Sequence, residues 1–199
     1  MSGGARTEQL NEVRIVDAAL RVAEQVGFDR ITMRALADEL GVTPMATYHY
    51  VSGKEQVLEL VADALLRRDR GNWEDLQWDE QLKRDAFELY DRLAKYPGLG
   101  AFLLERPLTP AMRESYGRGA ELFERAGLSR RDAELAHATY HTFMFGLIGM
   151  ETRFRPMQKR KRGAQRDEAV VVHATSREFI EFGLGVMIEG IRQRVSGGC

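Results

Sequence analysis

Two histidines with helical spacing are the side chains of this sequence best placed to do chemistry. His137 and His141 are four residues apart, so both imidazoles would lie on one face of a helix. Such a pair could bind one metal ion or one polar ligand, or it could simply be packed in a core. No carboxylate is evident in the pattern to complete a metal site, so we expect no metal and no cofactor.

Motifs of several common enzyme classes do not occur in the sequence. These are the Gly-x-Ser-x-Gly elbow, the His-Glu-x-x-His pair, the P-loop and the glycine-rich dinucleotide turn. The single cysteine, Cys199, excludes an intramolecular disulfide and a cysteine-rich metal site. We therefore expect that the protein is not an enzyme. A helical hydrolase or metal-dependent catalyst that uses the two histidines is the alternative.

The composition is that of a water-soluble globular protein. Hydrophobic residues make up 44% and charged residues 30% of the 199 residues, and the net charge is -1. The most apolar run, residues 143–150, is far shorter than the roughly 20 residues that a membrane-spanning helix needs. The polar N-terminus does not resemble a signal peptide. These features predict no membrane association and a cytoplasmic location.

Apolar residues recur at three- and four-residue spacing, which predicts an all-α fold. A three-helix domain is expected over residues 1–55, and a larger helical domain over residues 56–199. Residues 153–168 hold seven Arg or Lys and two acidic residues, so we expect a mobile loop there, although residues 159–162 could instead touch DNA or a membrane. The predicted helices span residues 8–26, 32–40, 44–50, 52–70, 78–95, 99–105, 110–126, 130–152 and 173–195.

Residues 31–51, which read ITMRALADELGVTPMATYHYV, have the pattern of a helix-turn-helix. Thr32 and Thr43 stand at positions that can cap two short helices. Gly41 supplies the permissive backbone of the turn between them, and Pro44 suits the first position of the second helix. A second helix of this kind could enter the major groove of DNA.

These residues belong to a longer segment, residues 15–60, that resembles the DNA-binding domain of the tetracycline-repressor (TetR) family. The remainder of the chain matches the family only in length and helical character. The resemblance implies a dimeric, DNA-binding transcriptional regulator whose C-terminal domain binds a small molecule. It is carried by Gly27-Phe28, Thr32, Arg34, Ala37, Gly41-Val42, Tyr48 and Lys54.

The resemblance also implies which residues face double-stranded DNA. Hydroxyl groups and the Lys54 ammonium could bind phosphates, and Arg34 could contact guanine. Met45, Ala46 and the Thr47 methyl group could pack on thymine methyl groups. The alternative for Thr47 is that its side chain faces inward. The second helix lacks Arg, Lys, Asn and Gln, so much of its specificity should come from apolar contacts and DNA shape. Tyr48 could alternatively be a core residue. The predicted DNA-binding residues are Thr32, Arg34, Thr43, Pro44, Met45, Ala46, Thr47, Tyr48, His49, Tyr50 and Lys54.

The C-terminal domain is rich in aromatic residues that could line a pocket for a largely apolar small-molecule effector. The alternative is that most of them are core. The candidate ligand-binding residues are Phe87, Tyr90, Phe102, Phe123, His137, Tyr140, His141 and Met144. We expect a homodimer formed by the last two long helices, with Gly146 and Gly149 allowing close approach on one helix. The other helix is apolar through Phe179, Phe182, Val186 and residues 188–191.

A two-fold dimer would read a near-palindromic operator. We expect a repressor. Its ligand would release it from DNA by shifting the helix predicted over residues 52–70. The alternative is that the protein activates transcription. Residues 1–55 carry six basic and eight acidic side chains, an unfavourable balance for binding phosphates. A helical protein that binds a protein partner and not DNA is therefore a further alternative.

Overall fold

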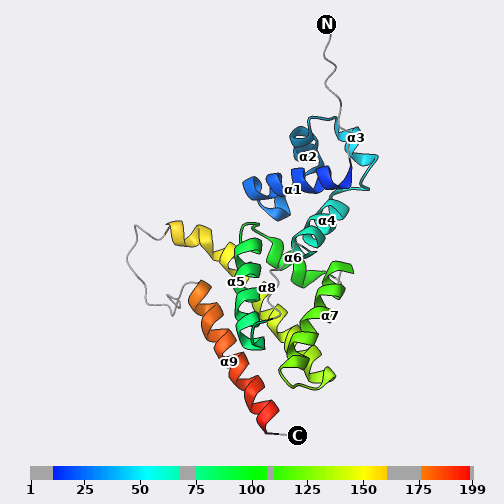
Figure 1. Ribbon diagram of the computed structural model, residues 1–199. Helices are drawn as coiled ribbons and strands as arrows, with labels where there is room; N and C mark the ends of the chain where they lie inside the picture. The colour runs from blue at the N-terminus through cyan, green and yellow to red at the C-terminus, as the bar shows by residue number, and fades with distance from the viewer. Residues whose placement is uncertain (1–10, 68–74, 107–109, 161–175, 198–199) are drawn as a thin grey trace.

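The computed structural model describes residues 11–67, 75–106, 110–160 and 176–197, and within them the chain is helical with no strand. This confirms the predicted all-α fold. The N-terminal head consists of α1 (Glu12–Val26), the single turn η1 (Phe28–Arg30), α2 (Met33–Leu40) and α3 (Pro44–Tyr48). Helix α4 (Lys54–Arg67) leads from the head into the body (Figure 1).

The body contains the longer helices and lies on the opposite side of α4 from the head (Figure 1). Helix α7 packs along α8 and also touches α4, while α6 packs on α8 and α9 on α5. The helices are α5 (Trp78–Leu93), α6 (Leu99–Glu105), α7 (Pro110–Arg125), α8 (Arg130–Arg160) and α9 (Ser176–Ser196).

Helix α8 is longer than predicted, since the expected loop was to begin at residue 153 and the helix ends at Arg160. The prediction was wrong there because Lys and Arg are good helix formers, and a basic segment need not interrupt a helix. The remainder of that predicted loop, residues 161–168, lies outside the described residues, as does the start of the helix expected at residue 173.

The predicted helix ends depend on local capping. The Gly27 N–H donates to the Ala23 carbonyl at the end of α1, and Gly41 adopts φ 68° at the end of α2, where a side chain would be strained. The Ser129 hydroxyl accepts from the Asp132 N–H at the start of α8. Ser52 and Glu55 have the spacing of a capping box, but the Ser52 N–H donates to the Gln56 side chain at 2.6 Å instead of to Glu55.

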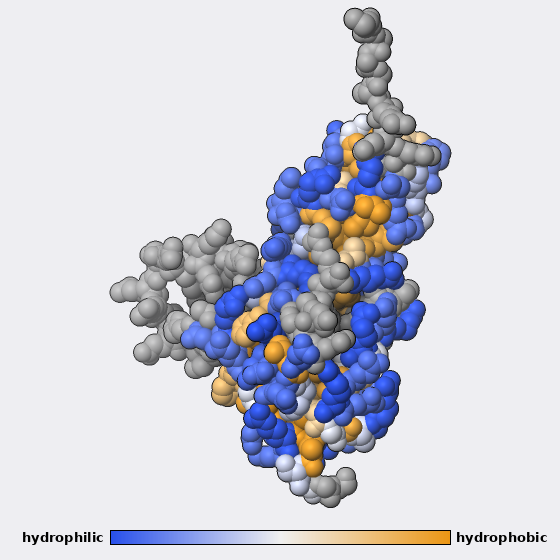
Figure 2. Space-filling model, viewed as in Figure 1, coloured by the Kyte–Doolittle hydropathy of each residue, from blue (hydrophilic) through white to orange (hydrophobic). Residues whose placement is uncertain are grey.

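A continuous hydrophobic core joins the head to the body. On α1, Ile15, Ala19 and Val22 are buried in this core, whereas Val26 at the end of the helix is exposed. The face visible in Figure 2 is mostly hydrophilic, with an apolar area on the N-terminal part near the body. Among the described residues, no helix combines the length and the hydropathy that crossing a membrane requires.

Candidate nucleic-acid interface and buried polar cluster

Helix α3 presents one face to solvent and one face to the core of the head. On the inner side Thr47 of α3 is buried, together with Leu36 of α2 and Val51, which follows α3. On the outer side Met45 is 70% exposed and Tyr48 is 50% exposed. Tyr48 is therefore not a core tyrosine. The other outward residues of the segment are Thr43, Pro44, His49 and Tyr50, with Ala46 half-buried between the two faces.

The two capping threonines are held in place by the helices that they start. The Thr32 hydroxyl oxygen accepts from the Ala35 N–H at 3.1 Å, and the Thr43 hydroxyl accepts from the Ala46 N–H at 3.3 Å. A hydroxyl that accepts in this way still has a proton to donate. Both side chains are exposed, so each could donate to a phosphate oxygen beside the helix N-terminus.

The two predicted cations differ in how firmly they are placed. Arg34 is exposed on α2. The Lys54 ammonium donates to the Asp29 carbonyl at 2.6 Å, which holds it against η1. A lysine ammonium has three donors, so this contact leaves capacity for a phosphate.

Thr47 does not lie where a base contact requires. Its side chain is inaccessible to solvent, and its hydroxyl donates to the Pro44 carbonyl at 2.7 Å within α3. The prediction that its methyl group packs on thymine is wrong, because that methyl group faces the core of the head. The inward alternative, which the sequence also allowed, is the observed one.

Helix α6 joins the head to the body. The Phe28 N–H donates to the Pro97 carbonyl at 2.6 Å, and the Phe28 and Phe102 rings meet edge to face with centroids 5.0 Å apart. At the other end of α6, Arg106 pairs with Glu55 in the first turn of α4 and lies over the Phe102 ring. Through these contacts α6 touches both η1 and α4.

The same helix crosses α8 at very close range. A Cβ atom added to Gly100 would lie 2.6 Å from the Gly149 nitrogen and 2.8 Å from the Phe145 carbonyl oxygen. Gly149 was predicted to allow close approach of a partner subunit, whereas in the structure it allows α6 of the same chain to approach. Among the described residues, no other helix comes within 4 Å of a Cβ added at Gly146.

Four polar side chains are buried together in the middle of the body. We call Asp85, His137, Tyr140 and His141 the polar cluster; all four are at most 7% exposed. The Tyr140 hydroxyl donates to the Asp85 carboxylate at 2.8 Å. The two imidazole rings are 4.2 Å apart between centroids. Phe123 lies next to His137, and Phe145 next to His141.

Some of the other candidate ligand residues lie near the polar cluster, and the rest lie elsewhere in the body. Phe123 and Met144 are buried near the cluster, and Tyr90 is half-buried on α5. Phe102 belongs to the junction with the head. Phe87 lies under the guanidinium of Arg177, a residue of α9, whose central carbon is 5.2 Å from the centroid of the Phe87 ring.

Asp85 was missed by the sequence analysis. It stands three residues after buried Leu82 and four before buried Leu89, so it occupies an apolar position of an amphipathic helix. That placement is the signal that could have found it. Even with Asp85 present, no group of three or more His, Cys, Asp or Glu suited to a metal ion occurs among the residues described.

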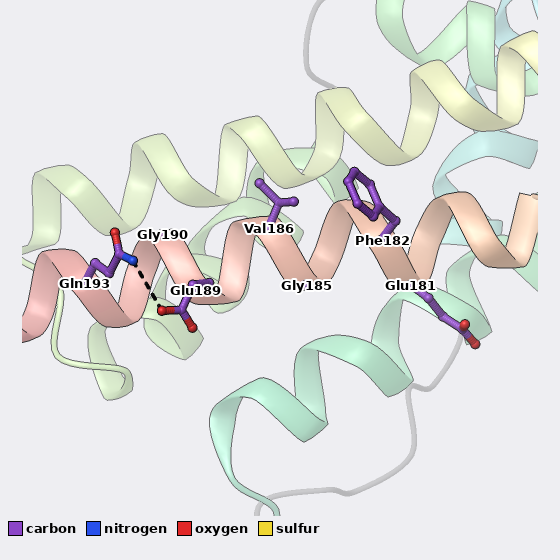
Figure 3. Close-up of a pocket in the computed structure, with 7 residues that line it drawn as sticks. All are labelled: Glu181, Phe182, Gly185, Val186, Glu189, Gly190 and Gln193. Carbon is purple, nitrogen blue, oxygen red and sulfur yellow. Dashed lines mark hydrogen bonds between the residues drawn. The ribbon is translucent and has the colours of Figure 1, made fainter. Parts of the chain in front are cut away.

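Part of the outer surface of α9 is apolar and is left exposed to solvent by the residues that the structure describes. Phe182 is 75% exposed and Val186 is 61% exposed. Figure 3 shows both side chains projecting from one side of the helix, while the Gln193 amide donates to Glu189 one turn further along. A groove of about 600 Å³ follows this surface, and Gly185 and Gly190 contribute to its lining.

The head has the architecture of a helix-turn-helix regulator, and comparison with known proteins identifies the family. Residues 15–61 match the family model described as bacterial regulatory proteins, tetR family. The repressor DrrR1 of Streptomyces coeruleorubidus is 31% identical over 63% of this chain, but the chain covers only 47% of that protein. The class A tetracycline repressor of Escherichia coli is 28% identical over 90% of the chain and 89% of the repressor.

The likeness extends to the body. BioQ of Mycobacterium smegmatis is 25% identical, with a TM-score of 0.71 over 92% of this chain and 98% of that structure. BioQ has also been crystallised with its double-stranded DNA operator. Residues 15–61 are therefore a domain of the tetR family of bacterial regulatory proteins, and the chain resembles the class A tetracycline repressor and BioQ over most of its length.

Proposed function

We propose that this protein is a transcriptional repressor that binds a near-palindromic DNA operator as a homodimer and is released by a small-molecule effector. The observation that carries the proposal is the two-sided α3, whose inner side chain Thr47 is buried while Met45 and Tyr48 stand out into solvent. A short helix presented in this way fits the major groove. The crystallisation of BioQ with its operator supports the same role for this head.

The residues proposed to meet DNA divide by chemistry into two groups. Thr32, Thr43, Tyr48 and Lys54 carry hydroxyl or ammonium groups that suit phosphate oxygens and would position the head on the duplex. Arg34 suits guanine, while Met45 and Ala46 suit thymine methyl groups. Pro44, His49 and Tyr50 complete the face. Most phosphate contacts in this set are neutral, so we expect fewer released counterions than a strongly basic domain gives.

The homodimer in this proposal forms through α9. Phe182 and Val186 present an exposed apolar ridge beside small residues that could receive a partner's side chain, and such a surface is costly to leave in water. The experiment is light scattering during gel filtration of Phe182→Arg, with Val13→Arg as the matched control. Val13 is equally exposed, at 67%, but lies on α1 in the head. Only the first variant should become monomeric; two dimeric variants would refute the role of α9.

Release of DNA is proposed to pass through α6. An effector that displaces α8 would move α6 at the Gly100–Gly149 crossing, and α6 holds both η1 and the first turn of α4. The effector must bind the free and the DNA-bound forms with different affinity, because equal affinity changes no equilibrium. The proposed domains are residues 1–55 and 56–199, with α4 as the connection, and the proposed place of action is the cytoplasm.

DNA binding is tested by selection from a random duplex pool at low and moderate salt, followed by sequencing. We expect an enriched near-palindrome whose half-sites are about one helical turn apart. The Tyr48→Ala variant should lose the enrichment, while Leu135→Ala, an equally exposed body residue, should keep it. No enrichment with the wild-type protein, before and after refolding to remove any copurified effector, would overturn the proposal.

A further inference from the structure

The connection between α5 and α6 is docked against the end of α1, and we call its residues 96–98 the docking loop. The Tyr96 ring is buried, and its hydroxyl donates to the Glu24 carboxylate of α1 at 3.2 Å. One helical turn further along the chain, the Phe28 N–H donates to the Pro97 carbonyl at 2.6 Å. The body therefore holds the head at two points of the corner between α1 and η1, through residues that belong to neither α4 nor α6.

The docking loop and the corner approach each other closely. A Cβ added to Gly98 would lie 3.0 Å from an oxygen of the Asp29 carboxylate, and one added to Gly27 would lie 3.5 Å from the Pro97 carbonyl oxygen. The Lys54 ammonium, at the start of α4, donates to the backbone carbonyl of Asp29. Close-packed contacts that involve backbone atoms leave little room for the two parts to slide, because the backbone cannot rotate away as a side chain can.

The docking loop is itself anchored in the body. Shortly before it, the Arg92 guanidinium donates to the Leu65 carbonyl at 3.1 Å, near the end of α4. Directly after it, Leu99 begins α6 and is inaccessible to solvent. Because both of its ends are held, the docking loop can transmit the position of the body to the head.

The hydrogen bond between Tyr96 and Glu24 restrains the orientation of the head. A head held only through η1 and α4 could still turn about that attachment. The bond to Glu24 opposes such a turn, because it lies on α1, four residues before Phe28. Helix α1 packs on α2, and α2 packs on α3, so any turn of α1 also moves α3.

In a two-fold dimer, the orientation of the heads sets the separation of the half-sites that they read. We propose that Tyr96 and Glu24 are positioning residues that fix the half-site spacing of the operator, an inference that rests on the homodimeric repressor proposed above. One extra base pair moves the half-sites apart by about 3.4 Å and rotates them by about 35°, so the heads must turn to bind that DNA. The wild-type protein then loses the hydrogen bond, whereas a variant that already lacks it has nothing to lose.

The test measures the affinity of the full-length protein for two DNAs in mobility-shift assays: the selected operator, and the same operator with one base pair inserted at its centre. The spacing ratio is the first affinity divided by the second. Tyr96→Phe keeps the buried ring and should lower this ratio about threefold to tenfold, the effect of one hydrogen bond. Glu24→Ala should lower it equally, and the double variant no further. Asp17→Ala removes a charge from another exposed position of α1 and should leave it unchanged.

The spacing ratio distinguishes positioning from stabilisation, because a partly unfolded variant loses affinity for both DNAs by the same factor. An unchanged ratio in Tyr96→Phe or in Glu24→Ala, or effects that add in the double variant, would overturn the inference. If the selected operator is bound and the ratio does not respond, this inference alone fails. If the selection yields no operator, the repressor proposal fails and this inference fails with it.

Discussion

Gly100→Ala tests the close crossing of α6 and α8 on which the proposed release of DNA depends. The new methyl carbon would begin 2.6 Å from the Gly149 nitrogen, whereas non-bonded carbon atoms settle at about 3.5–4.0 Å, so α6 must move by roughly 1 Å. Because the opposing atoms are backbone, no side chain can rotate away. Overpacking costs about 1–3 kcal/mol, and alanine in a helix stabilises by about 0.5–1 kcal/mol relative to glycine. The net expectation is a loss of about 1–2 kcal/mol.

The assay is thermal unfolding followed by circular dichroism at one fixed protein concentration, because dimerisation makes Tm depend on concentration. The loss corresponds to a Tm lower by roughly 2–8 °C for a chain of this size. Gly117→Ala on α7 is the matched control, since no neighbouring atom of the described residues lies within 4 Å of its added Cβ, and the Tm of this variant should rise. Operator affinity should fall in Gly100→Ala only. If both variants gain stability, the crossing is not as tight as argued and α6 cannot transmit movement through it.

Three further predictions concern single side chains. Thr43→Ala removes the cap of α3 and should lower stability by about 1 kcal/mol and weaken operator binding, whereas Thr43→Ser should restore both in melting and mobility-shift assays. Thr47→Val keeps the shape of a buried side chain, so operator affinity in the same shift assay should stay within about twofold of the wild type; a large loss would mean that the hydroxyl reaches DNA. Tyr140→Phe removes the donor to buried Asp85 and should lower the free energy of unfolding by about 1–3 kcal/mol in urea titrations, and an unchanged midpoint would contradict the buried hydrogen bond.

Most of the head could be predicted because its structure depends on short-range signals. Gly27 and Gly41 end helices through backbone conformations that other residues adopt at a cost, and Thr32 and Thr43 cap helices through contacts three residues away. The direction of Thr47 remained open, because a threonine is apolar enough for a core and polar enough for a surface.

The body was predicted less completely, because its features depend on contacts between residues that are distant in the sequence. Asp85 and Tyr140 are 55 positions apart, and no local pattern says that a carboxylate on α5 will meet a phenol on α8. Gly149 was expected at a subunit interface, because a small residue on a long helix permits close approach. The sequence does not show whether the approaching helix belongs to the same chain or to a partner. Only the packing of α6 supplied Gly100 as its partner.

The sequence by itself therefore determined the all-α fold, the helix-turn-helix and the set of side chains from which its outer face is drawn, because helical period and capping act over three or four residues. The tertiary structure decided which of those side chains face the core, how α6 connects the head to the body, and which polar groups gather around His137 and His141. These are decided by long-range packing, in which the lowest free energy depends on all the helices at once.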